Sequence, residues 1–153
     1  MVRLADLSEM EAQHLLDLPC PVYPDNPWTP GPAPADMRLA LITSAGLSRR
    51  GDDTFRPGAT DYRVIPAETD SADLIMSHVS TNYDRSGFQQ DINVVFPIDR
   101  VRELAADGAI GSVADYHYSF MGATEPEKLE AKARELAGLL KEDRVNAVLF
   151  TPV

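Results

Sequence analysis

Short apolar runs alternate along this chain with segments in which apolar residues recur at helical spacing. The apolar runs are rich in β-branched residues and predict strands. The predicted strands cover residues 37–44, 62–66, 74–76, 110–121 and 146–153. The predicted helices cover residues 8–18, 99–108 and 126–143. This alternation is typical of an α/β fold, and we expect a three-layer sandwich with a mostly parallel central sheet, Rossmann-like or flavodoxin-like.

Polar residues mark where the predicted helices begin. Capping boxes are predicted at Ser8 with Glu11 and at Thr124 with Glu127, because each pair has the spacing at which two side chains satisfy each other's backbone donors. Asp99 is expected to cap the helix that it begins.

A proline-rich segment separates the first helix from the first strand. Residues 19–34 hold seven of the twelve prolines, with Tyr23 and Trp28 between them. Proline fixes φ and removes a backbone donor, so the segment is expected to be extended. It is either a linker, a motif recognised by another domain or, as the aromatic residues favour, a strap packed on the domain. We therefore divide the chain into residues 1–36, the helix and strap, and residues 37–153, the α/β domain.

The composition excludes several classes of protein. The 153 residues suffice for one domain with a real core, and 24 acidic against 14 basic residues give a net charge of −10. That charge opposes binding to nucleic acid and to anionic membranes. A single cysteine, Cys20, provides no disulfide framework and no cysteine metal site, and no apolar run is long enough to cross a bilayer. We expect a cytoplasmic protein without a bound metal.

Polar side chains that follow buried strands are candidates for a site, because ligands collect at the carboxyl ends of parallel strands. His78 and His117 are predicted at such ends, although each can instead order a loop. Candidates for substrate binding are Arg49, Arg50, Asp84, Arg85, Asp91 and Tyr118. The arginines match a carboxylate with two parallel hydrogen bonds, whereas the aspartates can equally cap helices and Tyr118 can be part of the core.

Two motifs carry a resemblance to a known family. They are SHVSTNYDRSGFQQDINVVFPIDR, residues 77–100, and RELAADGAIGSVADYHYSFMG, residues 102–122. Together with the preceding strand and basic loop, they resemble the selenoprotein B family of glycine, betaine, sarcosine and D-proline reductases. The resemblance covers residues 37–153 and is greatest to the small D-proline reductase subunit and its stand-alone bacterial relatives.

The resemblance implies a chemistry and a missing residue. Family members cleave a C–N bond reductively, with a selenocysteine or cysteine nucleophile and with the substrate amine held by a pyruvoyl group on a partner subunit. For this chemistry the resemblance implies His78 and His117 as acid, base or thiolate-stabilising groups. In the family, the strand that resembles residues 147–153 leads directly into this redox residue. We therefore expect a selenocysteine, encoded by UGA, or a cysteine directly after Val153, and we expect the 153 residues alone to be inactive. A deliberate truncation or a natural edge strand is the competing explanation.

Two functions remain open from the sequence. One is a reductase subunit acting on a small amino-acid-like substrate, and the other is a non-catalytic binding protein that keeps the family pocket without the redox residue. A C-terminally truncated sheet also leaves an apolar face exposed, so we expect a homodimer or larger assembly.

Overall fold

The computed structural model describes residues 3–19, 22, 24–80 and 85–153, which fall into two units, Met1–Pro30 and Gly31–Val153. The first unit contains a 3-10 turn, Leu4–Asp6, and helix α1, Glu9–Leu16. The predicted capping box of α1 is confirmed, since Ser8 Oγ accepts from the Glu11 amide at 3.3 Å and the Glu11 carboxylate accepts from the Ser8 amide at 3.2 Å. The described residues between α1 and residue 33 form no helix or strand. The packing of a strap on the domain stays a prediction.

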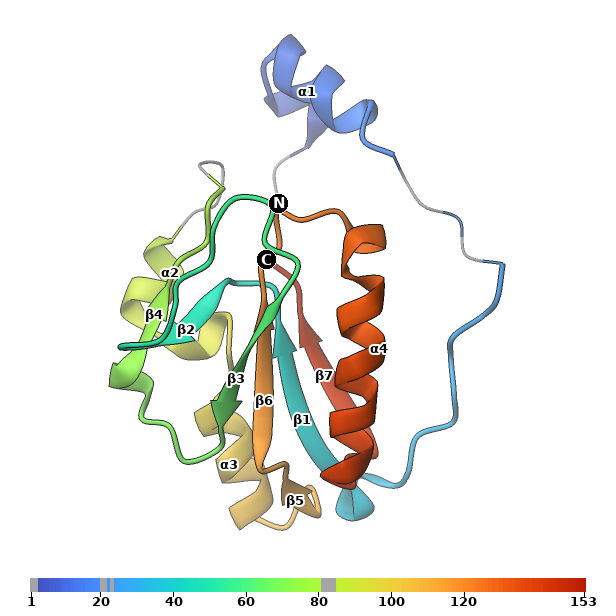
Figure 1. Ribbon diagram of the computed structural model, residues 1–153, viewed down its shortest axis with the longest axis vertical. Helices are drawn as coiled ribbons and strands as arrows, with labels where there is room; N and C mark the ends of the chain where they lie inside the picture. Colours follow the sequence, from blue (N-terminus) through green and yellow to red (C-terminus); the bar gives the residue numbers. More distant parts are fainter. Residues whose placement is uncertain (1–2, 20–21, 23, 81–84) are drawn as a thin grey trace. The chain divides into compact units, whose positions relative to one another are not determined.

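The second unit is built on a curled, mostly parallel sheet (Figure 1). Its strands are β1 (Arg38–Thr43), β3 (Tyr62–Pro66), β5 (Ser112–Val113), β6 (Tyr116–Phe120) and β7 (Ala147–Thr151). Strand β1 runs parallel to β5, β6 and β7, and β3 runs antiparallel to β6. The mixed α/β class is therefore confirmed, and the Rossmann-like or flavodoxin-like three-layer arrangement stays a prediction.

The strand predicted over residues 110–121 is divided into β5 and β6. The register against β1 shifts from Leu39↔Val113 to Ile42↔Tyr118, which leaves an irregular stretch between the two pairings. The Asp143 carboxylate fills part of this stretch by accepting from the amides of Asp115 at 2.8 Å and Tyr116 at 3.3 Å. A periodicity argument cannot detect such a break, because the apolar pattern continues across it.

Helices pack against both faces of the sheet (Figure 1). On one face, Ile98 and Val101 of helix α3 (Ile98–Ala106) join Leu41 and Phe96 in a buried cluster. On the other face, helix α4 (Pro126–Glu142) covers β1 and β6. Its side chains contact a second cluster, whose members are Ile42, Tyr118, Phe120 and Leu136, with Leu129 and Leu140 packed against them. Leu129, Leu136 and Leu140 therefore form the inner face of α4.

Three local predictions are wrong. Residues Leu74–Met76, expected in the parallel sheet, form β4 and pair antiparallel with β2 (Leu47–Arg49) in a separate two-stranded sheet. Pro97 rather than Asp99 is the N-cap of α3, and Glu125 rather than Thr124 is the N-cap of α4. The Thr124 hydroxyl instead donates to the carbonyl of Ala59 at 2.8 Å. The Thr124 side chain therefore hydrogen-bonds to a residue outside the helix, although the capping pattern predicts that it caps the helix.

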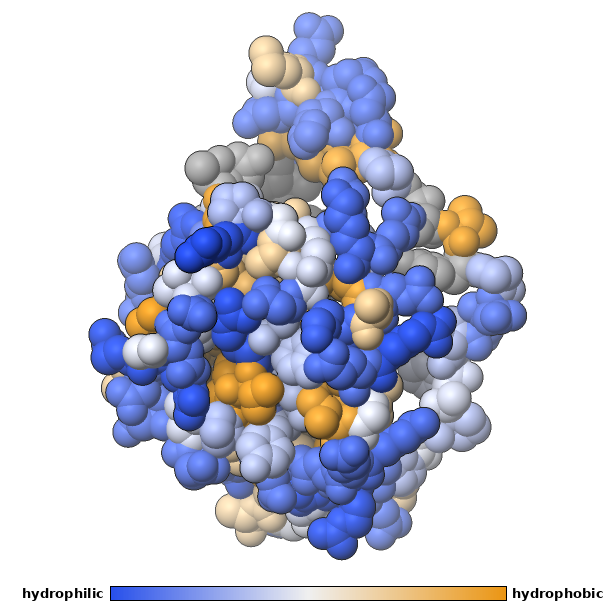
Figure 2. Space-filling model, in the orientation of Figure 1, coloured by the Kyte–Doolittle hydropathy of each residue, from blue (hydrophilic) through white to orange (hydrophobic). Residues whose placement is uncertain are grey.

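The remaining helical segments are short. Between β4 and α3 lie α2 (Ser86–Gln90) and a 3-10 turn (Ile92–Val94), and two further 3-10 turns precede β1 (Pro34–Asp36) and β4 (Ser71–Asp73). On the face seen in Figure 2, hydrophilic side chains predominate, with apolar patches over β3 and beside α4. None of the helices described is long and apolar enough to cross a membrane.

Candidate functional site

Three strands end together at one edge of the sheet. Strand β1 passes into Ser44, β6 into Gly122 and β7 into Val153. The Gly122 amide donates to the Ser44 carbonyl at 2.9 Å, and the Val153 amide donates to Ser44 Oγ at 2.8 Å. We call this place, together with Gly46 and His78 described next, the carboxyl edge.

The segment that follows β4 crosses the end of β1 at Gly46. The Ser77 amide donates to the Gly46 carbonyl at 2.9 Å, and Gly46 has φ 65°. A Cβ at Gly46 would lie 3.1 Å from both the amide nitrogen and the Cα of His78. Glycine is therefore required at position 46 for two reasons, the left-handed backbone and the close approach that brings His78 to the carboxyl edge.

His78 is buried at the carboxyl edge, with 7% of its surface exposed. Its Nδ1 accepts from the Ser80 amide at 3.2 Å, so the neutral ring carries its proton on Nε2. Arg85 donates to the carbonyls of His78 at 2.6 Å and Ser80 at 2.9 Å. Burial first and the Arg85 charge second lower the pKa of His78, which favours the neutral imidazole. The structure therefore brings two of the predicted site residues, His78 and Arg85, together.

His117 lies inside β6 and not at its end, so its predicted position at the carboxyl edge is wrong. It is fully buried, and its Nδ1 accepts from the Leu41 amide at 3.0 Å, at the point where the β1–β6 ladder is irregular. Its ring lies edge-on to Phe96, and Nε2 has no hydrogen-bond partner among the residues described. Burial lowers the pKa of His117 to about 4. These contacts support a structural role in the sheet.

Tyr118, the next residue of β6, points to the opposite face. It is buried in the cluster beneath α4, and its ring meets that of Tyr62 edge-on at 5.7 Å. Burial raises the pKa of Tyr118. Its position in the core does not bring it together with His78.

Arg49 and Arg50 lie at the other end of the β2–β4 sheet from His78. Arg49 pairs with Leu74, the first residue of β4, whereas His78 follows the last residue. The Arg49 guanidinium is paired with Asp52 at 2.9 Å, which raises its pKa, and Arg50 donates to the Ala72 carbonyl at 3.3 Å. The structure does not bring these two arginines to the carboxyl edge.

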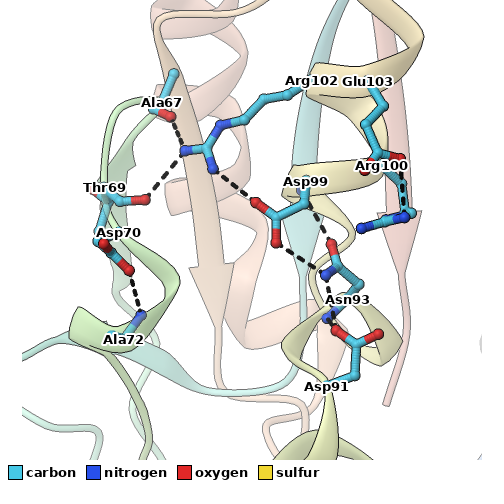
Figure 3. Close-up of polar contacts among 10 residues, drawn as sticks. All are labelled: Ala67, Thr69, Asp70, Ala72, Asp91, Asn93, Asp99, Arg100, Arg102 and Glu103. Carbon is cyan, nitrogen blue, oxygen red and sulfur yellow. Dashed lines mark hydrogen bonds and ion pairs between the residues drawn. The ribbon is translucent and has the colours of Figure 1, made fainter.

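Asp91 caps the 3-10 turn before α3. Its Oδ1 accepts from the backbone amide of Asn93 at 2.9 Å and from its side chain at 2.8 Å, and these bonds lower the pKa of Asp91 (Figure 3). In the same network, Arg102 of α3 bonds to Asp99 and to the carbonyls of Ala67 and Thr69. Asp84, like Cys20, lies outside the described residues.

Sequence reasoning missed the residues that assemble this edge. Ser44 binds the backbone at Val153, Ser77 accepts from the Phe55 amide at 3.0 Å, and Thr124 holds the carbonyl of Ala59. The signal was the Ser-Ala-Gly sequence directly after the first strand, which marks a chain that turns sharply at a strand end. The described residues contain no group of three or more His, Cys, Asp or Glu side chains that would hold a metal ion.

Comparison with known proteins identifies the family. The model of the glycine/sarcosine/betaine reductase selenoprotein B family matches residues 27–153. The chain belongs to this family. No solved structure matches the chain.

Curated relatives within the selenoprotein B family are subunits of reductase complexes. The D-proline reductase subunit gamma of Acetoanaerobium sticklandii is 38% identical over 135 residues, which cover 86% of this chain and 55% of that protein. The sarcosine reductase complex component B subunit beta of Peptoclostridium acidaminophilum is 32% identical, over 88% of this chain and 32% of that protein. A glycine reductase complex component B subunit gamma from Symbiobacterium thermophilum is 33% identical, over 80% of this chain and 30% of that protein. The chain therefore spans between 30% and 55% of the length of these relatives.

Proposed function

We propose that these 153 residues form part of a selenoprotein B-type reductase subunit that cleaves a C–N bond of an amino-acid-like substrate of the glycine, betaine, sarcosine or D-proline class. The observation that carries the proposal is the carboxyl edge. There the backbone of Val153 is hydrogen-bonded to Ser44, close to Gly122, while His78 lies at the end of the same strand β1. Family membership supports the reaction class.

We further propose that a selenocysteine or cysteine follows Val153 directly. The residues present fit such a group, because Ser44 is hydrogen-bonded to the backbone of Val153 and the side chain of His78 is buried at the same edge of the sheet. The redox residue would supply the nucleophile for C–N cleavage, and a partner subunit would supply a pyruvoyl group for the substrate amine. The only cysteine of the 153 residues is Cys20, far from the family motifs in sequence.

We propose that His78 donates or accepts a proton in this reaction. Its lowered pKa keeps the imidazole neutral at neutral pH, with Nε2 as the donor atom. A neutral imidazole can donate a hydrogen bond to the departing amine or to the nucleophile without itself staying protonated as an imidazolium. Arg85 supports His78 by bonding to its carbonyl. Of the two predicted histidines, His78 is therefore the one assigned to the chemistry.

Partner subunits and a cytoplasmic location belong to the same proposal. The curated relatives are named as subunits or components of reductase complexes, which supports assembly of this chain with other subunits. A single cysteine suits a reducing compartment. We also propose that the chain associates with a second copy of itself.

The second candidate function is a small-molecule-binding protein without redox activity. What favours it is that the carboxyl edge carries hydrogen-bonding groups from Ser44, Ser77 and His78 but no thiol among the described residues. Binding without turnover, by a polypeptide whose natural C-terminus is Val153, would support this candidate against the reductase.

The test is an assay of reductive cleavage. The natural polypeptide, purified with its partner subunits, is incubated with a dithiol and with D-proline, glycine, sarcosine or betaine, and the deaminated or ring-opened acid is measured. We expect product from at least one substrate, none from the 153 residues alone, and a kcat about 100-fold lower for His78→Asn. The matched control is His14→Asn on the exposed surface of α1, which should leave kcat unchanged. No product from any of the four substrates would contradict the proposal.

A further inference from the structure

The loop between β2 and β3 forms a polar hollow that the reductase proposal does not use. The hollow has a volume of about 360 Å³ and is lined by residues of this loop, among them Asp53, Thr54, Arg56 and Gly58. In Figure 1 the loop passes the end of the sheet at which the C-terminus lies.

Hydrogen bonds tie this loop to both sides of the carboxyl edge. The Phe55 amide donates to Ser77 Oγ at 3.0 Å, next to His78, and the Thr124 hydroxyl holds the carbonyl of Ala59 at 2.8 Å, just beyond Gly122. The loop is therefore anchored on either side of Arg56, and residues at or next to both anchors line the hollow.

Arg63 of β3 orders the floor of the hollow. Its guanidinium donates to the carbonyls of Asp53 at 2.7 Å and Thr54 at 3.4 Å, pairs with the Asp61 carboxylate at 2.6 Å and lies 4.3 Å from the centre of the Phe55 ring. A guanidinium with this many partners fixes the loop backbone before any ligand binds. It also neutralises Asp61.

Two opposite charges on the hollow remain available. Among the residues described, neither the Arg56 guanidinium nor the Asp53 carboxylate forms an ion pair or a side-chain hydrogen bond, and both residues are exposed. A guanidinium complements a carboxylate, and a carboxylate complements an ammonium group that carries N–H donors. One charge of each sign on a single hollow matches a zwitterion.

We propose that this hollow is where a zwitterionic amino acid first binds, with Arg56 receiving its carboxylate and Asp53 its ammonium group, before the pyruvoyl group of a partner subunit takes the amine. The inference rests on the proposed function for the substrate class and assigns to this loop the selection of the substrate. Because Asp53 can accept N–H bonds only from an amine that has them, the hollow favours D-proline, glycine and sarcosine over betaine, whose nitrogen is fully methylated. The exposed position of both side chains allows their replacement without loss of the fold.

The test is amino-acid binding to the 153-residue chain, measured by NMR titration with each of the four compounds. We expect saturable binding of at least one compound with an N–H group, weaker binding of betaine, and affinities about tenfold lower for Arg56→Gln and for Asp53→Asn. The matched controls are Arg144→Gln, after the end of α4, and Asp107→Asn, after the end of α3, which should bind as the parent does.

The outcomes separate this inference from the proposed function. The inference would be overturned if the Arg56 and Asp53 variants bound as tightly as the parent, or if the parent did not bind at all. Either result would count even if the natural polypeptide cleaves substrate. Loss of binding in these two variants alone would uphold it, even if no cleavage is found.

Discussion

Two histidines of similar sequence context have different environments. Both follow apolar residues in predicted strands, yet His78 is at a strand end with its carbonyl bonded to Arg85, and His117 completes the hydrogen bonding of a central sheet. The sequence predicts that each histidine lies near a strand. It does not predict which one is inside the sheet. That depends on the register shift between β5 and β6, where the carboxylate of Asp143, far along the chain, accepts from the backbone.

The buried imidazole of His117 should make stability depend on pH. Its pKa is lowered from 6.5 to about 4, so the unfolded chain binds this proton first as the pH falls. The contribution of the neutral His117 to the free energy of unfolding is therefore fully present above pH 6.5. It is lost between pH 6.5 and pH 4, and the loss reaches about 3 kcal/mol at pH 4. Urea unfolding from pH 7.5 to 4.5 measures this loss.

The variant His117→Asn tests whether His117 causes the pH dependence of stability. Asparagine keeps an acceptor for the Leu41 amide and has no proton to gain. We expect it to be less stable than the parent at pH 7.5 but to lose less stability on acidification. A pH dependence equal to that of the parent would show that other groups cause it, and His14→Asn on α1 serves as the control.

The helices and strands were largely predictable because they depend on local periodicity. The strands β1, β3 and β7 and helix α4 lie where the apolar pattern predicts them. The failures have one physical cause, which is that partners distant in sequence decided the outcome. Strand β4 pairs with β2 and not with the main sheet, and Thr124 binds Ala59 and not the helix that it precedes.

The junction of β1, β6 and β7 depends on Gly122. A Cβ there would lie 2.7 Å from the Ser44 carbonyl oxygen and 3.0 Å from that of Val153, and both are backbone atoms that cannot rotate away. We expect Gly122→Ala to lower the free energy of unfolding by about 1–3 kcal/mol, measured by urea denaturation.

Gly138 in α4 provides the matched control for this substitution. Nothing lies within 4 Å of the position that a Cβ would take there, so Gly138→Ala should raise stability by about 0.5–1 kcal/mol through helix propensity. Equal effects of the two substitutions would mean that the three strand ends are not packed as closely as described.

At the scale of the whole molecule, β7 is one of the edge strands of the sheet. Within the described residues it pairs only with β1, and Phe150 is 66% exposed beside an apolar groove of about 450 Å³ between β7 and α4. The strand carries no charged side chain in a chain of net charge −10. A second copy can therefore approach this edge with less electrostatic repulsion than elsewhere.

Self-association through this edge is measurable by light scattering at tens of micromolar. We expect a dimer or larger assembly for the 153-residue chain and a monomer for Phe150→Asp, because a buried carboxylate without a partner is costly. The control is Leu104→Asp on α3, a residue that is 44% exposed, which should not change the assembly. A monomeric parent would contradict the proposal that the chain associates with a second copy of itself.

The most direct test of the reductase proposal is to determine which residue comes directly after Val153 in the natural polypeptide, by sequencing its gene beyond that codon and by mass spectrometry of the purified protein. We predict that the next codon is UGA read as selenocysteine, or a cysteine codon, and that the intact mass includes that residue and a continuing chain. A natural polypeptide that ends at Val153 with a stop codon other than UGA, or that continues without selenocysteine or cysteine at this position, would contradict it.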